Sequence, residues 1–205
     1  MQSRPVAYPA VPVFPLPDFY LFPGTAAPLH IFEERYRQMM ADLMDRRGRL
    51  VTVPYSSSEP VGEDGPALPE IGTLAEIVHH EKLDDGRYLI LLLALGRVKV
   101  EEIESDRPYR QVRAEVLAEP ELASLASGAA RRDLLDALAE WTTGSQDVPA
   151  DAPVGRLADV LLQALPLGED QLRRAYLERD PLVRASLALA WHHLLHRPED
   201  GQEEE

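Results

Sequence analysis

The feature that most constrains the fold of this chain is an apolar segment near its start that is studded with prolines. Prolines and a glycine recur among bulky apolar residues over positions 12–17, 21–24 and 28–33, and Arg35-Tyr36 follows. Because proline restricts the backbone and glycine permits tight turns, this spacing is typical of a bent, buried strand and not of a generic surface loop. We therefore expect a rigid first strand.

Composition narrows the classes of protein to which the chain can belong. Its 205 residues include no cysteine, which excludes disulfides, thiol catalysis and cysteine-ligated metal. A formal net charge of -14 and a pI near 4.8 oppose binding to the phosphates of nucleic acids. Residues 1–9 lack the apolar core of a signal peptide, and the longest apolar run, residues 88–95, is too short to cross a bilayer. We expect a cytoplasmic protein with no nucleic-acid or membrane partner.

The residue pattern changes at about position 119. Short β-type runs separated by proline and glycine precede this point, whereas leucine, alanine, arginine and glutamate at helical spacing follow it. We predict a β subdomain over residues 1–119, a helical bundle over residues 120–197, and a disordered acidic tail over residues 198–205. A chain of this length buries such cores without covalent staples.

Within the first part, the pattern predicts antiparallel strands and one covering helix over residues 33–45. Asp84-Asp85-Gly86 separates two apolar runs and is typical of a hairpin. The run 88–95 is expected to be a strand covered on both faces, and later segments alternate polar and apolar residues as half-buried strands do. Six or more strands with one helix indicate a closed or nearly closed barrel.

The second part carries apolar stripes at helical spacing, which predict a small bundle. Its last helix is expected to begin at Asp180, which can cap the helix, with Pro181 at the first helical position. The apolar face predicted for this helix consists of Val183, Leu187, Trp191 and Leu194.

The proline-rich motifs resemble those of a known family. Phe14-Pro15-Leu16, Phe22-Pro23-Gly24 and Arg35-Tyr36 are similar to motifs of the N-terminal substrate-binding domain of Lon-type ATP-dependent proteases, especially its stand-alone bacterial relatives. Later segments, among them residues 71–77 and 95–98, follow in the order of the family, so the resemblance covers residues 11–195. It implies an α+β fold, a PUA-like antiparallel β pseudobarrel with one covering helix, followed by a C-terminal helical bundle.

The resemblance implies binding and not catalysis. In full Lon proteases this domain helps to capture unfolded or tagged proteins, whereas an ATPase and a protease module do the work. The chain contains no match to the P-loop pattern, and its only lysines, Lys82 and Lys99, fall in strand-like segments. We expect no enzyme activity and no cofactor.

Bulky apolar residues between Pro17 and Pro23 are candidates for a binding surface. An extended segment cannot direct all of them into a core, so we expect some of them to be exposed and to hold a peptide or partner. The predicted partner-binding set is Phe19, Tyr20, Leu21, Phe22, Pro23, Arg35 and Tyr36.

Two histidines near the end of the last predicted helix have the spacing of metal ligands. His192 and His196 are four residues apart and would share one helix face, which suits a divalent ion. The pattern lacks the glutamate of zinc peptidases, and histidines also suit the negative end of a helix dipole. We predict no metal site.

The predicted function is therefore that of a non-enzymatic module that binds unfolded polypeptide segments or a protein partner, as an adaptor in protein quality control. Two alternatives remain open. One is an RNA-binding protein that uses its PUA-like barrel, and the other is an enzyme of uncharacterised chemistry with a site in the barrel. The sequence favours no particular oligomeric state.

Overall fold

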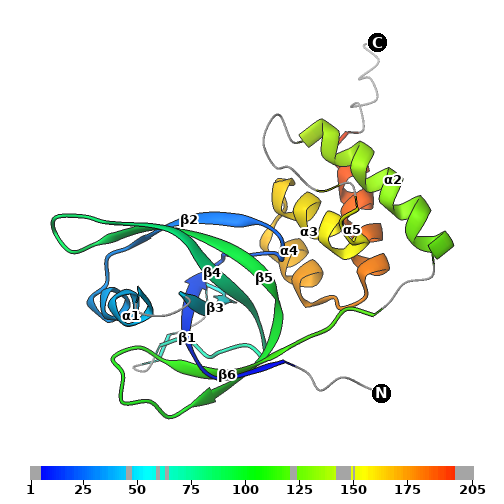
Figure 1. Cartoon of the computed structure of the whole chain (residues 1–205). Coiled ribbons are helices and arrows are strands. Elements are labelled where there is room, and N and C mark those ends of the chain that lie inside the picture. Colours follow the sequence, from blue (N-terminus) through cyan, green and yellow to red (C-terminus); the bar gives the residue numbers. More distant parts are fainter. Residues whose placement is uncertain are drawn as a thin grey trace. The chain divides into compact units, whose positions relative to one another are not determined.

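The computed structural model describes residues 6–44, 48–58, 61–62, 65–120, 124–141, 149 and 151–196 (Figure 1). It separates into two compact units, a sheet unit over residues 1–118 and a helical unit over residues 119–205. The predicted acidic tail, residues 198–205, lies outside the described residues. The elements are β1 (Ala7–Pro17), β2 (Ala26–Ile31), α1 (Glu34–Met44), β3 (Arg49–Tyr55), β4 (Ile71–Lys82), β5 (Tyr88–Ile103), β6 (Gln111–Val116), α2 (Ser124–Trp141), α3 (Val154–Ala164), α4 (Glu169–Leu177) and α5 (Pro181–Leu195).

The sheet unit consists of a mixed six-stranded sheet and α1. The strand order is β2-β5-β4-β3-β1-β6, and β6 also pairs with β5, so the ladders run from β5 through β4, β3, β1 and β6 back to β5. The predicted α+β class, with one helix on the sheet and a helical part after it, is confirmed. The prediction of an antiparallel sheet is wrong for one pair, because β1 and β3 are parallel. The chain crosses over through β2 and α1 between these two strands, which returns β3 in the direction of β1.

Strand β1 accommodates prolines because each of its halves has a partner strand on one side only. Its first half pairs with β6, up to Pro12 opposite Gln111, and residues 13–17 pair with β3. The ladder with β6 is interrupted between Tyr8 and Val11. Proline lacks the N–H donor, so it is tolerated where a strand edge has no partner or where a ladder is irregular.

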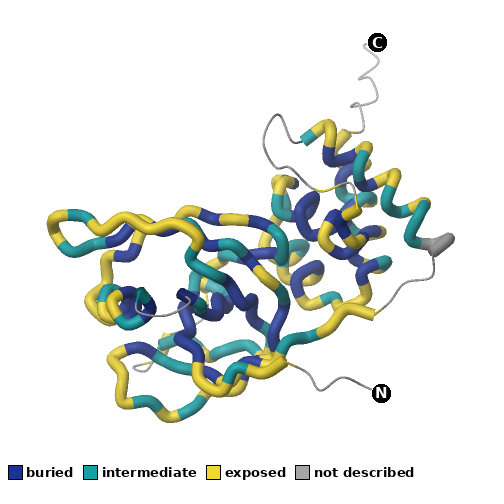
Figure 2. Tube along the Cα trace, viewed as in Figure 1, coloured by how far each residue is buried: buried dark blue, intermediate teal, exposed yellow. Residues whose placement is uncertain are grey.

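Two apolar clusters form the core of the sheet unit. In the first, the buried face of α1, including Met39 and Met40, packs with β5 residues such as Ile90 and Leu92. The second is rich in valine, including Val13, and lies among the strands that close the ring. Buried and exposed positions alternate along β2 and β6, whereas β1, β3 and β4 each contain a run of consecutive buried residues (Figure 2).

Strand β5 is a single long strand and not two strands separated at Gly96. Its burial alternates from Tyr88 to Leu95, with Leu92 fully buried and Leu89 and Leu95 about two-fifths exposed. The prediction that residues 88–95 are covered on both faces is therefore wrong. The predicted hairpin before β5 is confirmed, since Gly86 has a φ of 83° and the N–H of Leu83 donates to the carbonyl oxygen of Arg87 (2.8 Å).

In the helical unit, α3 packs against α2 and α5, and most residues of α3 are buried. The predicted start of α5 is confirmed, because the Asp180 carboxylate accepts a hydrogen bond from the N–H of Leu182 (2.8 Å) and Pro181 follows it. None of the described helices combines the length and hydropathy needed to span a membrane.

A buried ion cluster ties α3 and α5 to the segment that precedes α2. Arg184 is fully buried, its Nε lies 3.0 Å from Oδ1 of the buried Asp159, and its Nη2 contacts the carboxylate of Glu119. Its Nη1 donates to two backbone carbonyl groups at the end of α4. Gly155 makes room for the cluster, because a Cβ there would lie 2.6 Å from Nη2 of Arg184.

Candidate functional site

Most of the apolar segment after Pro17 is part of the core. Tyr20, Leu21 and Phe22 are buried, and only Phe19 and Pro23 are partly exposed. The carbonyl oxygen of Leu21 accepts a hydrogen bond from the Thr73 hydroxyl (2.8 Å) on β4. The expected exposure is thus limited to the two ends of the segment, because the central three side chains are buried and Leu21 belongs to the first core cluster.

The segment begins with a turn that Asp18 holds. Asp18 has a φ of 51°, and its carboxylate accepts hydrogen bonds from the backbone N–H of Ser57 (2.9 Å) and from the Ser57 hydroxyl. These hydrogen bonds favour the ionised carboxylate and lower the pKa of Asp18. The turn fixes where the chain enters the core.

Arg35 and Tyr36, at the start of α1, lie beside an open hollow of about 860 Å³. Tyr36 is buried, stands edge-on to Phe14 with ring centroids 4.5 Å apart, and has a pKa raised by burial. The guanidinium carbon of Arg35 lies 4.6 Å from the centroid of the Tyr36 ring, and Nη2 pairs with Glu33 (2.8 Å). The opposite wall is the segment between β5 and β6, residues 103–110. The structure thus brings two of the predicted residues to one hollow.

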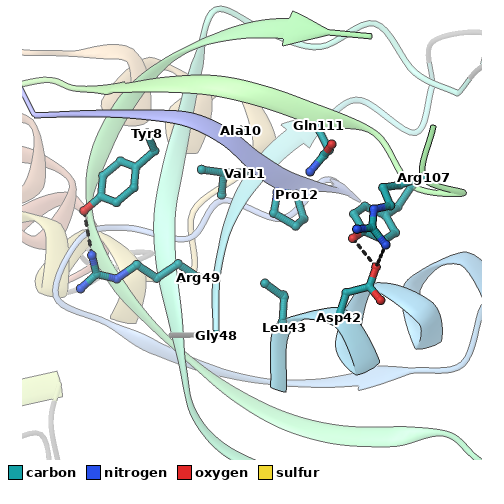
Figure 3. Close-up of a pocket in the computed structure, with 11 residues that line it drawn as sticks. Tyr8, Ala10, Val11, Pro12, Asp42, Leu43, Gly48, Arg49, Arg107 and Gln111 are labelled. Atoms are coloured by element: carbon teal, nitrogen blue, oxygen red, sulfur yellow. Dashed lines mark hydrogen bonds and ion pairs between the residues drawn. The ribbon is translucent and has the colours of Figure 1, made fainter. Parts of the chain in front are cut away.

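Two residues of this wall, Arg107 and Tyr109, also line a second, smaller cavity of about 230 Å³ (Figure 3). Asp42 of α1 accepts hydrogen bonds from Nη1 of Arg107 (2.9 Å) and from the hydroxyl of Tyr109 (2.7 Å), which fastens the wall to α1. At the other end, Nη1 of Arg49 donates to the hydroxyl of Tyr8 (2.8 Å). Each arginine is neutralised by a carboxylate, since Arg49 also pairs with a glutamate on β4. The cavity is therefore lined by paired polar side chains at its two ends and by apolar side chains between them.

A third feature is an apolar strip on the outer face of β2 and β5, which the sequence analysis missed. The register places three exposed β2 residues opposite three β5 leucines. Phe32, which follows β2 directly, is 63% exposed and lies with its ring 5.9 Å from that of His30. We define the outer strip as Ala26, Pro28, His30, Phe32, Leu89, Leu91 and Leu93. Residues 88–95 are apolar at nearly every position, so the sequence holds no alternation that marks which leucines lie on the outer face.

A group of potential metal ligands joins α2 to α5 in the helical unit. His192, His196 and Glu140 place one ligand atom each within 4.8 Å of one another. The indole N–H of Trp141 donates to Nδ1 of His192 (2.9 Å), so the neutral ring carries its proton on Nε2, which faces Glu140 at 3.5 Å. A metal ion could bind Nε2 of His192 only if this atom had no proton. Because Nδ1 accepts from Trp141, Nε2 carries the proton of the neutral ring, so the arrangement favours a hydrogen bond to Glu140 over a bound metal ion.

The second imidazole of the group has the opposite tautomer. Nδ1 of His196 lies 3.1 Å from the carbonyl oxygen of His192, which can only accept, so Nδ1 carries the proton. Its Nε2 lies 3.3 Å from the Glu140 carboxylate. Burial lowers the pKa of His192, and the charge of His196 lowers it further. The group is therefore a proton-linked contact between two helices.

Comparison with known proteins identifies the protein family that this chain resembles. The family described as the ATP-dependent protease La (LON) substrate-binding domain matches residues 10–189. A Lon protease 2 of Sorangium cellulosum is 30% identical over 88% of this chain, and one of Herpetosiphon aurantiacus is 27% identical over 88%. The chain spans about a quarter of the length of these relatives, 24% and 23%.

Solved structures show the same fold. The Lon N-terminal domain protein from Xanthomonas campestris has a TM-score of 0.64 and 22% identity, over 90% of this chain and 99% of that one. The N-terminal domain of the Mycobacterium avium complex Lon protease has a TM-score of 0.65 and 17% identity, over 90% and 98%. Since the family match extends through both units, this chain belongs to the LON substrate-binding domain family.

Proposed function

We propose that the sheet unit binds extended, apolar polypeptide segments along the edge of β2 and over the outer strip. The family supports recognition of polypeptide substrates as the general role. The single observation that carries the proposal is the position of the outer strip beside a strand that pairs on one side only. Edge strands and neighbouring apolar side chains together are what an added peptide strand needs.

The backbone of β2 is arranged for such an addition. The N–H of Ala94 donates to the carbonyl oxygen of Thr25, and the carbonyl oxygen of Ala94 accepts from the N–H of Gly24, both at 2.9 Å. The backbone groups of Ala94 on β5 therefore point toward the β2 side. In an antiparallel pair, hydrogen-bonded and non-hydrogen-bonded residue pairs alternate along the strands. Every second residue of β5, counted from Ala94, therefore bonds to β2. Pro28 and His30 lie opposite the positions between, and their backbone groups point away from β5. Pro28 fits there because it has no N–H to lose.

The side chains of the outer strip would supply most of the affinity. Phe32 and Leu89 expose large apolar surfaces at the end of β2 where α1 begins. Burial of apolar surface is the main favourable term in association. Strand β4 borders the strip with the exposed Glu81, which lies opposite Leu89. We expect bound segments to be apolar with basic residues at their flanks.

The predicted partner-binding set contributes at its exposed members. Arg35 lies three residues beyond Phe32 and lines the larger hollow with Tyr36, where it would contact polar parts of a bound segment. Phe19 and Pro23 retain some exposed surface. We further propose that the protein acts in the cytoplasm as a non-enzymatic adaptor, which delivers captured segments to a protease on other chains.

A paired substitution tests the surface. Leu89→Glu puts a charge into the outer strip, whereas Leu177→Glu changes a leucine of equal exposure (43% against 42%) in the helical unit. Fluorescence anisotropy with a labelled, permanently unfolded and alkylated test protein measures affinity. We expect Leu89→Glu to weaken binding roughly tenfold or more and Leu177→Glu to leave it unchanged. Equal affinity of all three proteins, or retention on RNA with no binding of the unfolded protein, would contradict the proposal.

A second pair of variants tests the strand edge. His30→Pro removes an outward N–H, and His30→Ala removes the same side chain but keeps that donor. We expect weaker binding for the proline variant than for the alanine variant at equal thermal stability. Identical affinities would show that the peptide does not use the backbone of β2.

A further inference from the structure

Helix α5 buries alanines and polar side chains and exposes several of its large apolar ones. The buried face contains Ala185 and Ala188, together with Arg184 and His192. The predicted apolar face lies on the other side, where Val183 is 42% exposed and Leu194 is 59% exposed. The expectation that the apolar face of α5 is its buried face is thus wrong. The helix packs against its neighbours through Arg184, in the ion cluster, and through His192, which accepts from Trp141.

The outward residues of α5 follow the spacing of a coiled-coil seam. Val183, Leu187, Ala190 and Leu194 are separated by four, three and four positions, and we call them the α5 seam. This is the alternation by which two helices interlock. Between Leu182 and Leu195 the helix carries one residue with a full charge, Arg184, and that residue is buried. An uncharged surface of this length is unusual on a chain of net charge -14.

We propose that the α5 seam is the interface of an antiparallel homodimer. Two copies of so acidic a chain repel each other, and like charges that meet at an interface cost affinity, so self-association is favoured where a surface carries none. The size of the side chains also matches a second copy. A twofold axis between Ala188 and Leu189 places Val183 opposite Leu194 and Leu187 opposite Ala190.

The same symmetry pairs large residues with small ones beside the seam. Ser186 comes opposite Trp191, a half-exposed aromatic residue of the kind that anchors interfaces. A parallel pair would place Ala190 against itself and leave a gap, so the antiparallel arrangement packs better. The seam is about 17 Å long at 1.5 Å per residue. A seam of this length is short for a specific interface, so the dimer should dissociate on dilution.

Sedimentation of the full chain over a concentration series tests the dimer. We expect the average mass to rise toward twice the monomer mass in the sub-millimolar range. Val183→Lys and Leu194→Lys should abolish the rise, whereas Leu177→Lys, a leucine of similar exposure on α4, should keep it. A constant monomer mass of the unmodified chain, or unchanged association of both seam variants, would overturn the proposal.

Cysteine cross-linking tests the orientation, because the natural chain has no cysteine. Mixed Val183→Cys and Leu194→Cys proteins should form a disulfide between the two variants under mild oxidation. Each variant alone should cross-link far less, since equivalent positions lie at opposite ends of the seam. Preferential cross-linking of each variant with itself would exclude the antiparallel dimer. These outcomes do not depend on whether the sheet unit binds polypeptides.

Discussion

The two units of the molecule build their interiors by different means. In the sheet unit, α1 and the strands meet mainly through apolar side chains, and the buried polar side chains among its described residues are three threonines and Arg97. In the helical unit, the centre holds a fully buried arginine with two carboxylates, and the buried face of α5 combines alanines with Arg184 and His192. The sheet unit is thus stabilised mainly by the burial of apolar surface, and the helical unit depends on a few specific polar contacts.

This difference teaches where each unit is vulnerable. Loss of one apolar side chain removes a share of a large total, whereas loss of one member of a buried ion cluster leaves its partners charged and unpaired. Both tryptophans, Trp141 and Trp191, are in the helical unit, so tryptophan fluorescence reports the unfolding of that unit alone. The contrast can therefore be measured unit by unit.

The largest expected effect is that of Arg184→Leu. Asp159 is 1% exposed and would lose its cation, so we expect the free energy of unfolding of the helical unit to fall by about 3–5 kcal/mol. Urea unfolding followed by tryptophan fluorescence measures it. The double variant Arg184→Leu with Asp159→Leu should recover much of the loss, because no buried charge remains. If Arg184→Leu alone were as stable as the double variant, the buried ion cluster would not make the helical unit more vulnerable than the sheet unit.

A core truncation in the sheet unit ranks next. Leu21→Ala should lower the free energy of unfolding of that unit by about 2–5 kcal/mol, since Leu21 is 1% exposed. The partly exposed Phe19 serves as the control, and Phe19→Ala should cost less. Far-ultraviolet circular dichroism follows the strands while the tryptophan signal stays unchanged. If Leu21→Ala abolished polypeptide binding at unchanged stability, the segment would be a binding surface and not core.

The smallest expected effect is a pH dependence of the helical unit. The pKa of His192 is lowered in the folded chain, so between that pKa and the ordinary value of about 6.5 the unfolded chain binds more protons. Stability should be full above this window and fall as the pH drops through it. His196 and His193 act in the same direction as burial, and Glu140 opposes them.

Tryptophan-detected urea midpoints at neutral and mildly acidic pH test this dependence. His192→Asn keeps an acceptor for the Trp141 indole and removes the titrating ring, so its midpoint should change less with pH. An equal slope for both proteins would mean that groups other than His192 control the acid sensitivity of the helical unit.

The sequence was informative where one signal acts alone. The hairpin at Gly86 and the capped start of α5 at Asp180 depend on local backbone chemistry, and both are as predicted. The face of α5 depends on partners remote in sequence, because Arg184 is buried only where Asp159 and Glu119 meet it. Periodicity cannot reveal such pairs.

The candidate site was partly predictable for the same reason. Arg35 and Tyr36 line a hollow, whereas Tyr20, Leu21 and Phe22 are buried after the turn that Asp18 holds. The outer strip arises from the cross-strand register of β2 and β5, which only the assembled sheet fixes.

The pairing of β1 has a consequence during synthesis. The first half of β1 leaves the ribosome before its partner β6, which ends at Val116, so about a hundred residues must be made between them before the ladder can form. An apolar strand that waits unpaired invites association with other nascent chains. The prolines within it, Pro9, Pro12, Pro15 and Pro17, interrupt that route, because a proline cannot donate to a foreign ladder. The residues that first marked the fold also protect the chain until the fold exists.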